Sequence, residues 1–263
     1  MPLPEGYQEI AAPFGLPRHI EAVWTSLAAT RASERILPDG RCDIILRFRT
    51  AADGGISGIV GIVAGPSTAY HDVSTEPGTG FVGVRLRPGF ARAVLGLPLA
   101  PLANAVLHGQ DMHERFPGWE ALCEPAADVE ALISRLAGFV SERSARSGLW
   151  PPTRTLDIVG AIHAGAGRLT VGELAALHGV TARTVRRDVM EHTGLTPKAL
   201  SQVLQFHRAV RLMRGAGLDT VSTALEAGYA DQAHMTRSFR RFGGFTPARM
   251  PLVAMSDRPL GDY

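Results

Sequence analysis

The hydrophobic pattern along the chain divides it into two halves of different character. In the first half, short segments rich in β-branched and aromatic residues alternate with clusters of Gly, Pro and Asp. Three of these segments are Cys42–Arg49, Gly58–Val63 and Gly80–Leu86, and Pro38-Asp39-Gly40 and Glu76-Pro77-Gly78 are two of the clusters. Short strands separated by turn signals predict a small β-barrel or β-sandwich.

The pattern changes to a helical one at residues 127–146, where apolar residues recur three or four positions apart. This spacing predicts an amphipathic helix. Pro151-Pro152 then interrupts the pattern, because two adjacent prolines cannot continue a helix. No convincing strand follows Thr153. We therefore predict a β-rich domain over residues 1–150 and an all-helical domain over residues 153–253.

The helical half contains an approximate internal repeat. The two copies are Thr170–Pro197 and Thr220–Pro247. Ala175 and Gly179 align with Ala224 and Gly228 at an offset of 49 residues, whereas the later pairs are offset by 50, so the second turn carries one extra residue. Each copy ends in Gly-x-Thr-Pro. The repeat indicates two copies of one helical unit.

Each copy has the residues that a helix-turn-helix requires. In the first copy, Ala175 is small enough for the first helix to cross the second closely, and Gly179 is expected to supply the positive φ that ends the first helix. Thr181 is expected to cap the second helix, whose Val185 and Val189 face the core. The corresponding residues of the second copy are Ala224, Gly228, Asp231, Met235 and Phe239.

The segment between the copies, Pro197–Arg214, predicts a linker helix with apolar residues at helical spacing. Proline suits its first turn. At ~1.5 Å per residue the helix is roughly 27 Å long, and successive major grooves on one face of DNA are about 34 Å apart. A linker of this size suits two recognition helices in adjacent grooves.

Several motifs of the helical half carry a resemblance to a known family. They are Leu174-Ala175, Gly179-Val180-Thr181, Gly194-Leu195-Thr196-Pro197, Ala227–Arg241 and Gly244-Phe245-Thr246-Pro247. Through them, the segment from about Thr155 to Met250 resembles the DNA-binding domain of the AraC/XylS family of transcription regulators. The resemblance implies double-stranded DNA as the partner. It also implies base or phosphate contacts from Arg183, Arg186, Arg187, Gln232, Ala233, His234 and Arg237. Thr181 is expected as a further DNA contact, and Arg240 and Arg241 are expected at phosphates.

Three positions depart from the pattern of that family. Thr223 stands where a branched apolar residue is usual, and Gln205 stands where the linker helix often has arginine. Gly243-Gly244 is expected to end the second recognition helix early. We expect these departures to weaken the second unit without abolishing it.

The first half resembles the β-rich N-terminal domain of one AraC-type subgroup, through Leu37–Ile45, the Ala64-Gly65-Pro66 turn and Phe81–Phe90. The resemblance implies a cupin-like partial barrel with flanking helices, and therefore an α+β fold overall. It also implies that this domain senses a small-molecule effector or mediates homodimerisation. RNA polymerase is a further partner that it allows, and neither the effector nor the direction of regulation follows from it.

The charge distribution is consistent with a DNA-binding second half, and the cysteine content limits the kinds of site that the chain can carry. Residues 1–150 carry 13 basic and 16 acidic residues, whereas residues 151–263 carry 14 and 9, and a basic half suits a polyanionic partner. The two cysteines, Cys42 and Cys123, lie far apart, which argues against a disulfide framework and a structural zinc site. No signal peptide or membrane-spanning run is found, so we predict a cytoplasmic protein.

Two other functional classes are weighed against sequence-specific regulation. A non-specific architectural DNA binder is the first alternative, and competition with bulk DNA separates the two. A cupin-like metal-dependent enzyme is the second, but the histidines of the first half, His19, His71, His108 and His113, lack metal-ligand spacing. A DNA-repair methyl acceptor needs more cysteines than the two present. We therefore expect no enzymatic activity and no cofactor.

Some residues of the first half carry two interpretations. Cys42 is expected to be structural, with a redox sensor as the alternative. Asp39 and Asp43 are expected at a turn and a strand end. Trp24, Trp119 and Phe81 are expected in the core, with an effector pocket as the alternative.

Overall fold

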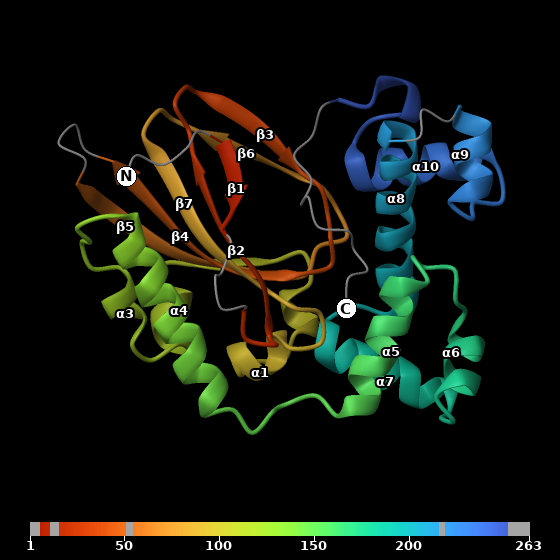
Figure 1. Ribbon diagram of the computed structural model, residues 1–263, viewed down its shortest axis with the longest axis horizontal. Helices are drawn as coiled ribbons and strands as arrows, with labels where there is room; N and C mark the ends of the chain where they lie inside the picture. Colours follow the sequence, from red (N-terminus) through yellow and green to blue (C-terminus); the bar gives the residue numbers. More distant parts are fainter. Residues whose placement is uncertain (1–5, 11–15, 51–54, 216–218, 252–263) are drawn as a thin grey trace.

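The computed structural model describes residues 6–10, 16–50, 55–215 and 219–251. Its first part is an antiparallel sheet with strand order β1-β2-β7-β4-β5-β8 (Figure 1). The strands are β1 (Gly6–Glu9), β2 (Ile20–Leu27), β4 (Cys42–Thr50), β5 (Ile56–Ala64), β7 (Thr79–Leu86) and β8 (Val106–His108). Strands β3 (Ala32–Ile36) and β6 (His71–Thr75) form a separate two-stranded ribbon. The sheet is not closed into a barrel, and the predicted α+β fold with a partial barrel is confirmed.

The main core lies between one face of the sheet and a group of helices. Side chains alternate along β4, so that Ile44, Leu46 and Phe48 are fully buried on this face. The helices are α1 (Ala91–Leu95), η1 (Ala100–Leu102), α2 (Gln110–Arg115), α3 (Trp119–Leu122) and α4 (Val129–Ala145). Helix α4 is the predicted amphipathic helix, and it contributes Leu132 and Leu136 to the core.

One glycine of β5 allows a large ring to lie on the sheet. A Cβ atom at Gly61 would lie 2.1 Å from the Trp119 ring, which only glycine avoids. Trp119 is 1% exposed and packs against Phe116 and Phe139. It is therefore a core residue, as expected.

The second part of the chain is helical. Its helices are α5 (Thr153–Ala164), α6 (Val171–Leu177), α7 (Ala182–Thr193), α8 (Pro197–Gly215), α9 (Thr220–Glu226) and α10 (Gln232–Gly243), followed by η2 (Pro247–Arg249). Helix α8 is the predicted linker. It contributes to two apolar clusters, one with α5, α6 and α7 and one with α9 and α10. No helix in the described ranges is both long and apolar enough to span a membrane.

The two parts are connected by residues 147–152, which form neither helix nor strand. The domain limits of 1–150 and 153–253 stay a prediction, and their outer ends, residues 1 and 253, lie outside the described residues.

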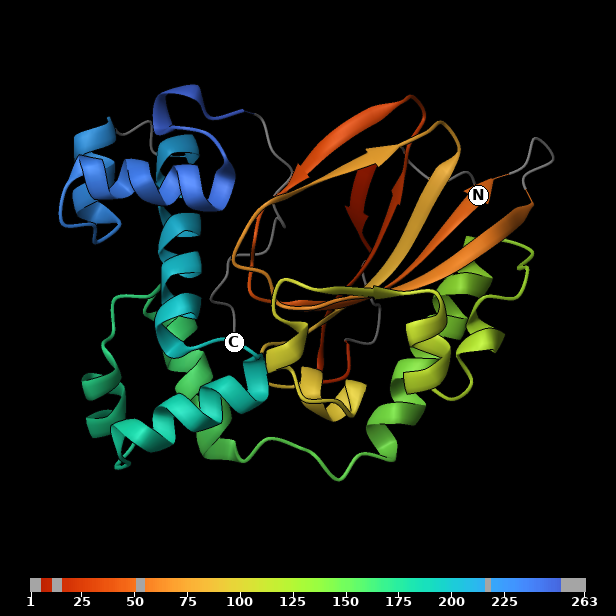
Figure 2. The same cartoon turned by 180° about the vertical axis from the view of Figure 1, so that it is seen from behind.

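The β-rich part contacts helices α7, α8 and α10 of the helical part. Helices α7 and α10 lie near opposite ends of α8, and the C-terminal end of each is directed toward the sheet domain (Figure 2). At the end of α7, a Cβ atom on Gly194 would lie 2.7 Å from the carbonyl oxygen of Leu99. At the end of α10, Nη1 of Arg35 donates to the carbonyl oxygen of Gly243 at 3.2 Å. The N-terminal ends of both helices lie on the opposite, outer side.

Candidate nucleic-acid interface

The first helical unit is a helix-turn-helix built from local signals. Thr170 and Glu173 form a capping box at the start of α6. Gly179 has φ +62°, the predicted left-handed turn. The side chain of Thr181 accepts a hydrogen bond from the Thr184 backbone N–H and caps α7. These features orient α7 so that its apolar face is buried and its polar face is exposed.

The second unit repeats this construction with different residues. Asp219 caps α9, and Gly228 has φ +81°. Asp231 accepts a hydrogen bond from the His234 backbone N–H at 2.6 Å and caps α10. Tyr229 fills the corner and is 5% exposed, and its hydroxyl group is hydrogen-bonded to that of Ser238 at 2.9 Å.

The buried faces of α7 and α10 match the predicted ones. Val185 and Val189 of α7, like Met235 and Phe239 of α10, are 0% exposed. The predicted DNA contacts fall on the other faces. Nine of them are exposed: Thr181, Arg183, Arg186, Arg187, Gln232, Ala233, Arg237, Arg240 and Arg241. The tenth, His234, is half-buried because its ring packs edge-on against Tyr229.

The arginines on the exposed faces of α7 and α10 differ in the side-chain contacts that they form. Arg187 donates twice to the buried carboxylate of Asp188, at 3.0 and 2.9 Å. Arg241 lies over the Phe242 ring, with its Nη1 3.4 Å from Gln202 Oε1. In contrast, Arg183, Arg186 and Arg237 form no ion pair within the described part of the chain.

The departures from the family pattern have structural explanations. Gln205 Nε2 donates to the Gly228 carbonyl oxygen at 2.7 Å and joins the linker helix to the second turn. Thr223 is fully buried in the second unit. The expected early end of α10 is wrong, because α10 and α7 both have 12 residues. Gly244, with φ +70°, caps α10 as Gly194 caps α7.

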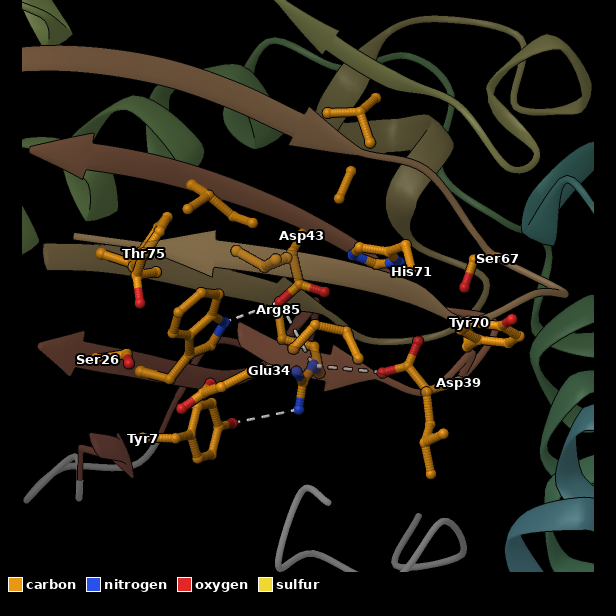
Figure 3. Close-up of a pocket in the computed structure, with 18 of the residues that line it drawn as sticks. Tyr7, Ser26, Glu34, Asp39, Asp43, Ser67, Tyr70, His71, Thr75 and Arg85 are labelled. Atoms are coloured by element: carbon orange, nitrogen blue, oxygen red, sulfur yellow. Dashed lines mark hydrogen bonds and ion pairs between the residues drawn. The ribbon is translucent and has the colours of Figure 1, made fainter. Parts of the chain in front are cut away.

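A cavity of about 500 Å³ lies between the sheet and the β3–β6 ribbon. Its walls include Trp24 and Phe81, so these two aromatic residues line a cavity, and their role in an effector pocket stays a prediction. Asp39 and Asp43 also line it, together with Arg85, and Figure 3 shows these three side chains converging. The Asp43 and Arg85 pair is a cross-strand pair in the β4–β7 register.

Arg85 is the centre of a charged cluster in this cavity. Its Nε lies 3.4 Å from Asp43 Oδ1 and 3.8 Å from Asp39 Oδ2, and its Nη1 lies 3.8 Å from Glu9 Oε1. Burial raises the pKa of Asp43, whereas the Arg85 and Arg41 guanidinium groups hold the pKa of Asp39 below its usual value. Sequence reasoning missed this cluster, although an arginine within the apolar strand GFVGVRL was a signal for it.

The cysteine and histidine residues considered as candidate sites in the first half do not form a common site in the described residues. Cys42 is 3% exposed on the core side of β4, and burial raises the pKa of its thiol, so the structural interpretation fits. In the described residues, no three His, Cys, Asp or Glu side chains are grouped as a metal ion requires. His71 lines the cavity, whereas His113 pairs with Glu120 on the surface.

Each part of the chain matches a known protein family. Residues 174–250 match the family described as "Helix-turn-helix domain", and residues 8–108 match "Domain of unknown function (DUF6597)". The chain is 34% identical over 68 residues to the HTH-type transcriptional activator RhaS of Escherichia fergusonii, which covers 26% of this chain and 24% of that protein. It is 24% identical over 127 residues to RhaS of Salmonella arizonae, covering 48% and 38%. The chain thus spans well under half the length of these relatives.

Two solved structures are similar at low sequence identity. An AraC-type transcriptional regulator from Chromobacterium violaceum has 22% identity and a TM-score of 0.34, over 36% of this chain and 86% of that chain. ToxT from Vibrio cholerae has 10% identity and a TM-score of 0.44, over 93% and 97%. Residues 174–250 thus match a helix-turn-helix family, and over part of its length the chain is similar in sequence to HTH-type transcriptional activators.

Proposed function

We propose that this protein is a sequence-specific regulator of transcription whose helices α7 and α10 read adjacent major grooves. The observation that carries the proposal is the exposed, arginine-bearing face on each of these helices. Helix α8 joins them and has 19 residues, a length of about 28 Å at 1.5 Å per residue. This is close to the groove repeat of about 34 Å.

The arginines divide into two groups by their surroundings. Arg183, Arg186 and Arg237 are exposed without an ion pair in the described structure, which suits bidentate contacts to guanine. Arg187 and Arg241 are held in place by neighbouring side chains, which suits phosphate contacts that position the protein on the duplex. Arg240, an exposed residue in the last turn of α10, is also assigned to a phosphate, by its position in the helix and not by a side-chain contact.

The other predicted contacts complete each recognition helix. Gln232 and His234 in the first turn of α10 supply hydrogen-bonding groups for base edges, and Ala233 suits contact with a thymine methyl group. We assign a phosphate contact to the hydroxyl group of Thr181, the N-cap of α7. Each face therefore combines base readout with anchoring.

We propose further that the β-rich domain controls the relative placement of the two recognition helices. It contacts α7 through Leu99, α10 through Arg35, and α8 through Pro38. A ligand or a second copy of the chain that shifts this domain changes both helices at once, since all three contacts lie on it. The cavity beside β3 and β6 is the place for such an effector.

Selection of binding sites from a random duplex library tests the proposal. The full chain is expected to enrich two short conserved blocks whose centres are about one helical turn, 10–10.5 base pairs, apart. Enrichment of a single conserved block would mean that only one of the two helices reads the DNA sequence. Enrichment of no sequence, despite retention of DNA, would support the architectural alternative.

A further inference from the structure

The cavity of the β-rich domain has an apolar body and a charged end. The ring of Trp24 lies 5.6 Å from that of Tyr7, and Phe81, Ile45 and Val73 add further apolar surface. A cavity of about 500 Å³ with this lining fits a small organic molecule. The charged end then decides which class of molecule it accepts.

Carboxylates outnumber guanidinium groups at the charged end. Arg41 is buried and paired through two nitrogens with both oxygens of Glu21. Arg85 has three carboxylates within 4 Å, those of Glu9, Asp39 and Asp43. The two guanidinium groups are therefore surrounded by four carboxylates, and a ligand carboxylate would be a fifth. Like charges in a poorly solvated site repel strongly, so an anionic ligand is disfavoured.

The aspartates keep acceptor capacity for a ligand. The Arg85 contacts, at 3.4 and 3.8 Å, are longer than ordinary hydrogen bonds. Asp39 Oδ1 accepts from the Arg41 backbone N–H at 3.0 Å, and Asp43 Oδ1 accepts from Trp24 Nε1 at 2.8 Å. Each carboxylate thus retains a second oxygen for which no hydrogen bond is found in the described residues.

Aromatic rings also line the cavity, where their faces are available to a bound positive charge. Ring faces attract cations, most strongly that of tryptophan. Tyr7 lies next to Arg85 in the cavity (Figure 3). Trp24 Nε1 donates to Asp43 Oδ1, and the Trp24 ring lies 5.6 Å from that of Tyr7. Desolvation lowers the pKa of His71, which also lines the cavity, so this ring competes less as a cation there.

We propose that this cavity binds a small organic cation, with its ammonium group at Asp39 and Asp43 and its apolar body against Trp24 and Phe81. The inference rests on the proposed control of the DNA-binding domain by an effector, and it names the chemical class of that effector. Asp39 follows Pro38, whose carbonyl oxygen is bound by His207 of the linker helix. A cation drawn to Asp39 therefore contacts the loop that holds α8.

Calorimetric titration of the full chain, without DNA, tests the inference. The probes are two sets, each matched in its carbon skeleton: 2-phenylethylamine, 2-phenylethanol and phenylacetate, and cyclohexylmethylamine, cyclohexylmethanol and cyclohexanecarboxylate. We expect at least one amine to bind at least tenfold more tightly than its alcohol and carboxylate partners. Tighter binding of a carboxylate or an alcohol, or binding of no amine at millimolar concentration, would overturn the proposal.

Two variants locate the bound cation. Asp43→Asn and Asp39→Asn are each expected to reduce amine affinity about tenfold or more, whereas Asp111→Asn, an exposed acid outside the cavity, changes nothing. Either aspartate variant suffices if the other does not fold. Unchanged amine affinity in a folded variant would place the cation elsewhere and refute the site.

Specific DNA binding is measured on the same preparations. Specific DNA binding without amine binding would refute the proposed ligand class and leave the proposed regulator function standing. Amine binding without specific DNA binding would remove the proposed regulator function and leave the cavity's ligand class intact.

Discussion

Nε2 of His207, on the linker helix, lies 2.6 Å from the carbonyl oxygen of Pro38 in the β-rich domain. A carbonyl oxygen only accepts, so Nε2 carries the hydrogen and donates it. His207 is 5% exposed, and burial lowers its pKa to about 4. The neutral ring therefore joins the linker helix to the loop that also carries Asp39.

This pair predicts a pH-dependent stability. The folded-state pKa of His207, about 4, is below the ordinary value of 6.5. Unfolded chains therefore take up a proton between these values while the folded protein does not, and stability is lost as pH falls from 6.5 toward 4. The difference in unfolding free energy between wild type and His207→Gln should shrink over this range, by up to about 3 kcal/mol. Denaturant unfolding at pH 7.5 and pH 4.5 measures it.

The matched control is His108→Gln, because His108 is exposed. The same loss of stability in His207→Gln as in wild type would show that His207 does not titrate in the predicted way.

The contact at the end of α7 predicts a difference between two glycines. Gly194 and Gly179 both have positive φ, 73° and 62°, so alanine at either site is expected to cost about 1 kcal/mol in backbone strain. A Cβ atom at Gly194 would also meet the Leu99 carbonyl at 2.7 Å, whereas at Gly179 it meets open space. Gly194→Ala should therefore destabilise by about 1–3 kcal/mol more than Gly179→Ala. Equal losses in thermal unfolding would mean that the α7 contact with the β-rich domain is not formed.

The N-cap of α10 predicts a local loss of stability. Asp231 accepts a hydrogen bond from the His234 backbone N–H, and removal of such a cap costs about 1 kcal/mol. Asp231→Ala should lower the free energy of unfolding by this amount, whereas Asp231→Asn, which keeps an acceptor oxygen, should be close to wild type. An alanine variant as stable as wild type would argue against the cap.

Salt and sequence dependence should separate the two groups of arginines. Arg240→Ala is expected to weaken binding to all duplexes alike and to reduce the salt slope by about 1. Arg186→Ala is expected to cost about 1–3 kcal/mol at one base pair of the site. Titrations at several salt concentrations, with single-base variants of the duplex, measure both effects. A uniform loss from Arg186→Ala would assign it to a phosphate.

The helical domain could be predicted from sequence because its signals are local. Gly179 ends one helix and Thr181 starts the next within a few residues, and the same order recurs at Gly228 and Asp231. The strands β4, β5 and β7 were also predicted, because turn residues delimit them.

The cavity could not be predicted, because its cluster is assembled over long sequence distances. Arg85 contacts Tyr7, which lies 78 residues away in the sequence. It also contacts Asp43, for which the local pattern predicted only a position at the end of a strand. The ribbon of β3 and β6 that covers these residues pairs Ala32 with Thr75 across a long connection. Alternation along β7 shows that Arg85 faces away from the core, but not what lies opposite.

Reading of DNA by both α7 and α10 is the central feature of the proposed function. The test is a titration of the full chain against a duplex selected from the random library, with excess unrelated DNA present. Arg186→Ala and Arg237→Ala should each weaken the specific complex tenfold or more, whereas Arg115→Ala, an exposed arginine of the β-rich domain, should leave it unchanged. A complex that competitor DNA abolishes, or that neither recognition-helix variant weakens, would contradict sequence-specific reading by α7 and α10.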